Sequence, residues 1–338
     1  MIRYIEEHQV FILETKSTQY AMCVRPDGHL EHLCYGGRSL DCGEQNTVGL
    51  WDVTHDRSLF ETGNAVVLDG GLTLESLLQE LSSNGKGDVS EPFVCMTHAN
   101  GSTTCDFVYE SYEIKNGRDE LEGLPCAVER GGGMRDGVVV DDVQQSTQTD
   151  DGQNDVGAGV TQLIVTLRDK CYNQKLELIY VTWDDSDVIT RSTRLTNESD
   201  DVERVDRLMS MQLDMRMYRE YDMIHFGGAW AREMHRAEHP VRQGRVSVSS
   251  STGASGSRAN PFFMVAEHGS SEEHGECYGF NLIYSGDHME TCEQNSYGRM
   301  RILSGINPEG FSFVLEPGQS LQSPEAVMAY SDSGFGGV

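Results

Sequence analysis

The chain has 338 residues, with 54 Asp or Glu against 26 Lys or Arg, and a formal net charge of −28 at pH 7. This excess of acid argues against nucleic acid and anionic membranes as partners, because both bind basic protein surfaces. No apolar run approaches the roughly 18 residues of a membrane span, and the charged stretch Met1 to Glu7 does not match a signal peptide. We therefore expect a cytoplasmic protein.

The first elements predicted are strands within residues 2–15, 19–25 and 29–35, with Pro26-Asp27-Gly28 as the turn between the last two. Residues 36–45 are loop-like. The irregular stretch Val48-Gly-Leu-Trp-Asp52 follows, and segments of this kind tend to carry functional residues on a rigid scaffold. Asp52 is the first candidate site residue; the alternative is a solvated turn acid or a helix cap.

Residues 74–81 have the i, i+3, i+4, i+7 apolar spacing of one short helix. Residues 141–159 are polar and acidic without an apolar period, so we expect a mobile surface insertion; their spacing matches no calcium loop. Elsewhere β-branched and aromatic runs, bounded by turn residues, recur without helices between them. The runs lie at 93–97, 107–114, 126–129, 163–168, 175–182, 188–196, 205–213, 275–286, 299–305, 311–315 and 325–331. This spacing predicts an all-β fold, a large antiparallel sandwich with one or two short helices.

The stretch from Asp222 to Glu233 holds the other candidate site residues. Gly227 and Gly228 allow positive φ and a close approach of the backbone to another surface, and Trp230 and Arg232 follow at once. A flat apolar ring beside a multi-donor cation suits a sugar, which offers an apolar C–H face and hydroxyl groups. The alternative is a strand end with a core Trp and a surface Arg.

Metal and cofactor chemistry finds little support in the sequence. The nine cysteines are odd in number, widely spaced and without a C-x-x-C pair, which favours free buried thiols over disulfides or a zinc site. His235 and His239 would share one face of a helix as metal ligands do, but Pro240 follows directly and no third ligand suggests itself. The nucleotide-binding, zinc-protease and serine-hydrolase motifs are absent. We expect no metal and no cofactor, and the residues alone name no catalytic centre.

A resemblance adds to this reading. Taken in order, several segments look like the N-terminal domain of family 36 glycoside hydrolases, the bacterial and fungal α-galactosidases: Tyr35-Gly, 74–80, 188–192, Ile224-His-Phe-Gly-Gly-Ala-Trp-Ala-Arg-Glu233, Asn260-Pro-Phe, 275–286, 305–318 and 323–332. The resemblance implies that residues 1–338 form one β-supersandwich domain. In the family this domain packs on a catalytic (β/α)8 barrel, which supplies the aspartate nucleophile and the aspartate acid/base of a retaining mechanism. We expect that barrel to be missing from this chain, which would then be inactive alone.

The resemblance also implies roles for the candidate residues. The acid matching Asp52 contacts the terminal galactose, and the Trp matching Trp230 packs in the same pocket. Arg232 matches the Arg after that Trp, with a less defined role. The acidic insertion is unusual for the family and leaves the local strand register open. Family members are often tetramers, so a homo-oligomer is expected.

Three hypotheses follow. The first is a non-catalytic domain of an α-galactosidase acting on terminal α-D-galactose of melibiose- or raffinose-type sugars, with the barrel as partner. The second is a free-standing carbohydrate-binding or barrel-partner protein. The third is a structural or assembly domain whose Trp and Arg are packing residues.

Overall fold

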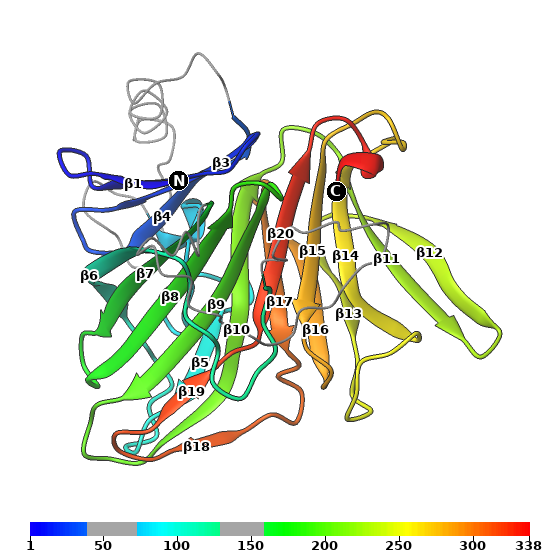
Figure 1. Cartoon of the computed structure of the whole chain (residues 1–338). Coiled ribbons are helices and arrows are strands. Elements are labelled where there is room, and N and C mark those ends of the chain that lie inside the picture. Colours follow the sequence, from blue (N-terminus) through cyan, green and yellow to red (C-terminus); the bar gives the residue numbers. More distant parts are fainter. Residues whose placement is uncertain (39–72, 129–158) are drawn as a thin grey trace, which may run out of the picture.

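The computed structural model describes residues 1–38, 73–128 and 159–338, and within them the chain forms antiparallel strands in three sheets (Figure 1). The largest sheet has ten strands in the order β12-β11-β14-β15-β20-β9-β8-β7-β6, with β19 paired to β9. The second has six, in the order β13-β16-β17-β10-β18, with β5 paired to β10. The third is the four-stranded meander β1-β2-β3-β4. The all-β expectation is confirmed.

The strand bounds follow the predicted runs closely where a run alternates over its length. In the meander they are β1 Ile2–Ile5, β2 Val10–Glu14, β3 Thr18–Val24 and β4 Leu30–Gly37. In the six-stranded sheet they are β5 Val94–Thr97, β10 Glu203–Arg216, β13 Gly244–Ser249, β16 His288–Gln294, β17 Arg299–Ile306 and β18 Phe313–Leu315. In the ten-stranded sheet they are β6 Phe107–Asn116, β7 Val160–Asp169, β8 Gln174–Trp183, β9 Val188–Asn197, β11 Tyr221–Ala229, β12 Arg232–Pro240, β14 Ala259–Glu267, β15 Cys277–Ile283, β19 Ser320–Gln322 and β20 Glu325–Ser331.

One hydrophobic core joins all three sheets. Buried side chains from the meander (Phe11), the ten-stranded sheet (Leu178, Phe280) and the six-stranded sheet (Met211, Ile302) belong to a single cluster. The inward faces of paired sheets in a sandwich fill the space between them in this way. The fold is therefore one continuous body.

The meander covers one end of the sandwich, at the upper left of Figure 1. Tyr4 and Phe11 pack on Tyr112 of β6, with ring centroids 4.6 Å and 5.2 Å apart. At the β8–β9 turn the Asp187 carboxylate accepts backbone N–H bonds from Ser17 at 2.9 Å and Thr18 at 3.2 Å. The N-terminal sheet is thus attached through both apolar and polar contacts.

Two local predictions are wrong. The predicted helix at 74–81 is a single 3-10 turn, Leu74–Ser76, and the remainder forms bends and one isolated bridge at Gln79. The backbone N–H groups of Gln79 and Glu80 donate to the Asp214 carboxylate at 3.0 Å and to the Leu30 carbonyl at 3.2 Å, so tertiary partners outweigh helical spacing. Residues 126–128 form no strand, because the Ala127 N–H donates to the Glu325 side chain at 2.6 Å. The acidic insertion lies outside the described residues, apart from Gly159 at its end.

Candidate functional site

The hairpin of β11 and β12 carries two of the three candidate site residues. Its register runs from Asp222 opposite Pro240 to Ala229 opposite Arg232, with Trp230 and Ala231 in the turn. β14 pairs with the other side of β11, so β12 is the edge strand of the ten-stranded sheet. In Figure 1 the two strands leave the body of the sandwich at its right side. All of β12 except Ala237 is exposed. β12 and the tip of the hairpin therefore project beyond the core, whereas Tyr221 to Ile224 of β11 are buried in it.

Trp230 lies at the tip of this hairpin and is 94% exposed. A Trp side chain usually buries 150–250 Å², and nothing in the described part of this chain covers it. The alternative of a core Trp in this domain is therefore wrong. Arg232 is also exposed and begins β12, two residues further on.

At Gly227 and Gly228 glycine is needed because other backbone atoms lie close to the Cα, and not because φ is positive. Neither Gly227 nor Gly228 has positive φ, so that part of the prediction is wrong; the left-handed residues are Ala231 and Met234, at 58° and 54°. A Cβ on Gly228 would lie 2.4 Å from the Arg232 carbonyl oxygen and 2.9 Å from the Glu233 Cα. Only glycine fits here, because those atoms are backbone and cannot rotate away. Gly228 thus fixes how the Trp230 turn closes.

Asp52 lies outside the described residues, but the chain on both sides of its segment is fixed. β4 ends at Gly37, and after the segment the chain returns to the same strand. There the His32 N–H donates to the Leu78 carbonyl at 2.8 Å, and Glu31 is bridged to Gln79. Both anchors of the Asp52 segment are therefore built on β4.

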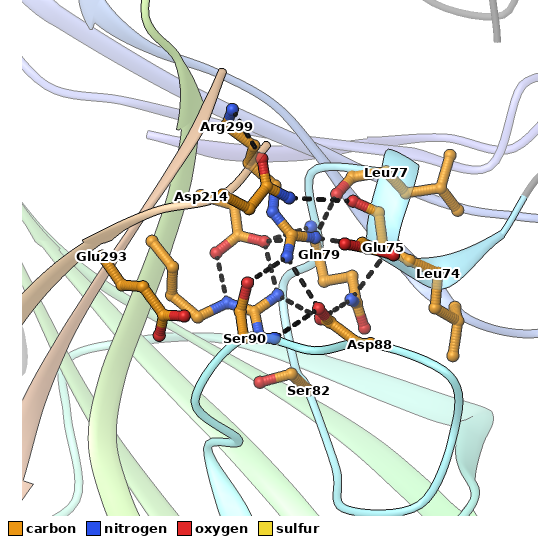
Figure 2. Close-up of polar contacts among 12 residues, drawn as sticks. Leu74, Glu75, Leu77, Gln79, Ser82, Asp88, Ser90, Asp214, Glu293 and Arg299 are labelled. Carbon is orange, nitrogen blue, oxygen red and sulfur yellow. Dashed lines mark hydrogen bonds and ion pairs between the residues drawn. The ribbon is translucent and has the colours of Figure 1, made fainter. Parts of the chain in front are cut away.

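A buried ionic network holds the returning chain to the six-stranded sheet (Figure 2). Arg301 forms a two-bond contact with Asp214, at 2.8 Å for each N–O pair, and also pairs with Asp88 at 2.8 Å. Arg299 pairs with Asp88 at 2.8 Å and donates to the Leu77 carbonyl at 2.8 Å. Burial opposes ionisation of Asp88, yet the two guanidinium groups lower its pKa to about 2. Two arginines and two aspartates thus balance in charge, and Asp88 ties residues 74–90 to the arginines of β17.

A second buried network surrounds Glu80. Its carboxylate accepts hydrogen bonds from the hydroxyls of Tyr20 at 2.6 Å and Tyr180 at 2.5 Å, and it pairs with Arg191 at 2.9 Å. Burial raises the pKa of such a group, but Arg191 and His32 reverse the effect and the pKa of Glu80 is lowered. A charged, fully bonded carboxylate with no exposed surface is a structural element and offers no base to a substrate.

His98, Cys105 and Glu203 superficially resemble a nucleophile–base–acid arrangement that the sequence did not reveal. His98 Nδ1 lies 2.8 Å from Glu203, and its Nε2 lies 3.2 Å from the Thr104 carbonyl and 3.6 Å from Cys105 Sγ. Because Nε2 must donate to that carbonyl, it cannot accept the thiol proton. Burial also raises the pKa of Cys105 far above its usual range. The trio is a packed polar contact.

Trp230 and Arg232 line neither of two cavities found among the described residues. One of about 380 Å³ lies among Tyr35, Tyr221, Tyr278 and Glu276, whose carboxylate accepts the Tyr221 hydroxyl at 2.7 Å. The other, of about 390 Å³, is polar and borders the network of Figure 2 at Asp88 and Glu293. The described ranges contain no group of three or more side chains that could hold a metal ion. Nor do they contain a helix long and apolar enough to cross a membrane.

Comparison with known proteins decides the family. Residues 28–316 match the glycosyl hydrolase family 36 N-terminal domain. The chain belongs to this family. Alpha-galactosidase Mel36A of Lactobacillus acidophilus is 30% identical over 99% of the chain, and alpha-galactosidase AgaA of Geobacillus stearothermophilus is 31% identical over all of it. The chain spans 42% of the length of each of these relatives.

Solved structures agree with the family 36 fold. The galactosidase domain of the alpha-galactosidase–sucrose kinase AgaSK superposes with a TM-score of 0.83 at 28% identity, over 99% of this chain and 42% of that one. The alpha-galactosidase of Lactobacillus brevis superposes with a TM-score of 0.82 at 30% identity, over 98% of this chain and 40% of that one. The family 36 domain described here therefore aligns with one part of longer enzymes.

Proposed function

We propose that this family 36 domain supplies part of the galactose pocket of an α-galactosidase that removes terminal α-D-galactose from oligosaccharides of the melibiose and raffinose type. The exposed position of Trp230 carries the proposal. Trp230 is 94% exposed in a hairpin turn whose close backbone contacts leave room only for glycine at position 228. An uncovered Trp at a fixed position is suited to a ligand or to a second protein surface.

Chemistry assigns a role to each candidate residue. The Trp230 ring would lie against the apolar C–H face of the sugar, and the Arg232 guanidinium would donate to hydroxyl oxygens. Asp52 would accept hydrogen bonds from galactose hydroxyls. The relatives support the substrate class, because solved structures of AgaA variants contain raffinose or stachyose.

Catalysis in this proposal belongs to a (β/α)8 barrel on which the domain packs. Retaining glycosidases need two carboxyl groups about 5–5.5 Å apart, one as nucleophile and one as acid/base. The relatives are more than twice as long as this chain, which leaves ample length for such a barrel. In the assembled enzyme, the domain would contribute binding and orientation, and the barrel the covalent chemistry.

The free-standing carbohydrate-binding alternative is tested by calorimetric titration of galactose and raffinose into the purified chain, with Trp230→Ala as the control. Saturable binding lost in the variant would favour an independent sugar site. Absence of binding to the folded chain, together with a raised Michaelis constant for Trp230→Ala in the assembled enzyme, supports a pocket shared with the barrel. Release of nitrophenol from nitrophenyl α-galactoside by this chain alone, lost on changing one of its carboxylates, would refute the assignment of catalysis to the barrel.

A further inference from the structure

The projecting hairpin contains a cross-strand histidine pair outside the proposed sugar site. His225 on β11 and His239 on β12 have their Nε2 atoms 3.1 Å apart, and the ring planes differ by only 9°. The ring centroids are 5.2 Å apart, so the imidazoles meet edge to edge through Nε2 and do not lie over one another. One Nε2 must therefore be the donor and the other the acceptor.

The strand register explains this pair and corrects the one suggested by sequence. His225 lies opposite Ala237, so His235 and His239 occupy the two diagonal positions on the same face. Because residues 232–240 are a strand, the Cα atoms of His235 and His239 are about 13 Å apart and these two side chains cannot share an ion. His235 and His239, the pair suggested by the i, i+4 spacing, therefore do not meet. The partner of His239 is His225 on β11.

The distance between the two Nε2 atoms is that of two imidazoles on one metal. With metal–nitrogen bonds of 2.0–2.1 Å, two ligands at angles between octahedral and tetrahedral values lie about 2.9–3.4 Å apart. The observed 3.1 Å falls inside this interval. Because the rings now face one another through Nε2, both rings must turn for their lone pairs to meet at one ion, and His239 is exposed and has room to do so. The strongly acidic chain would also favour the approach of a cation.

We propose that His225 and His239 chelate a divalent transition-metal ion through their Nε2 atoms, with water filling the other coordination positions. Imidazole nitrogen selects ions such as Zn²⁺ and Ni²⁺ over Mg²⁺ or Ca²⁺. Only two protein ligands are involved, consistent with the absence of any three-ligand group in the described ranges. The Nδ1 of His225 is buried without a hydrogen-bond partner, so no neighbouring group orients this ring and the site is a weak one. The bound ion would link β12 to β11 at the end of the hairpin away from the Trp230 turn.

The test is calorimetric titration of Ni²⁺ into the purified chain at pH 7.5, with three variants. Loss of either ligand, in His225→Ala or His239→Ala, is expected to weaken binding by about tenfold or more, because a two-ligand chelate becomes a single contact. His235→Ala is the matched control, on the same strand and face, and is expected to bind as the parent does. Lowering the pH to 5.5 should abolish binding, since protonated imidazoles cannot ligate metal.

A second readout does not depend on heats of binding. Arg232 and Arg236 are exposed trypsin sites on β12, and Ni²⁺ should slow cleavage there in the parent chain and in His235→Ala but not in His239→Ala. His239 is exposed, so its variant is expected to fold even if His225→Ala does not. Saturable Ni²⁺ binding that persists unchanged in folded His239→Ala, or no saturable binding by the parent chain, overturns the proposal.

Discussion

Replacing Arg301 by Met should destabilise the domain strongly, because it unbalances the buried network of Figure 2. Arg301 is buried and makes three charged contacts of 2.8 Å, two with Asp214 and one with Asp88. Arg299 remains beside both acids, at 2.8 Å from Asp88 and 3.5 Å from Asp214. Two buried carboxylates would then share one guanidinium.

Breaking a buried ion pair from one side costs about 3–5 kcal/mol, because a desolvated charge loses its partner. The matched control is Arg204→Met, since the Arg204–Asp206 pair at 2.9 Å is on the surface and such a pair contributes about 0–1 kcal/mol. Urea unfolding monitored by circular dichroism measures both variants. In Arg301→Met one carboxylate should take up a proton more readily, so the deficit should shrink as the pH is lowered from 7 to 5. A loss within 1 kcal/mol of the control, or a deficit that does not change with pH, would refute the reasoning.

Three further predictions address the site and the core. Gly228→Ala should raise the Michaelis constant of the assembled enzyme, because its Cβ would clash with the Arg232 carbonyl; Gly256→Ala, with no atom within 4 Å of its Cβ, should not. Asp52→Ala should weaken galactoside binding by about 1.5–3 kcal/mol, the usual contribution of a hydrogen bond to a charged group, and an unchanged Michaelis constant would remove Asp52 from the pocket. Burial raises the pKa of Glu290 to about 7 despite its 2.8 Å bond with His288, so its stabilising contribution is complete below about pH 4.5 and lost as the pH rises towards 7. Glu290→Gln should flatten that part of the stability profile in urea unfolding series, and an unchanged slope would assign the dependence to other groups.

The sequence predicted the strands in which β-branched residues alternate, but it missed β12, β13, β16 and β19 and the irregular segments. β7, β8 and β9 lie where their β-branched runs alternate, because one or both faces of each strand are buried. The helix prediction at 74–81 was wrong because it rested on apolar spacing alone. The backbone N–H groups of this segment donate instead to Leu30 and Asp214, which are far away in sequence. Local periodicity carries no information about such partners.

The sequence named candidate site residues but could not give their geometry. The Gly-Gly-Ala-Trp-Ala-Arg stretch named Trp230 and Arg232 as candidates, which stay predictions, and their exposure follows from β11 and β12 extending past β14, a property of sheet length. The pairing of His225 with His239 depends likewise on a cross-strand register that no spacing within one segment reveals. Asp52 remains a prediction, since its position lies outside the described residues.

The most direct test of the central claim is the steady-state hydrolysis of raffinose by the assembled enzyme with Trp230 intact and with Trp230→Ala. Because Trp230 packs against nothing in the described part of this domain, the variant should unfold at the same urea concentration as the parent. Its Michaelis constant should rise about tenfold, equivalent to about 1.4 kcal/mol of lost ring–sugar contact. An unchanged Michaelis constant with unchanged stability would show that Trp230 does not contact the substrate and would contradict the account.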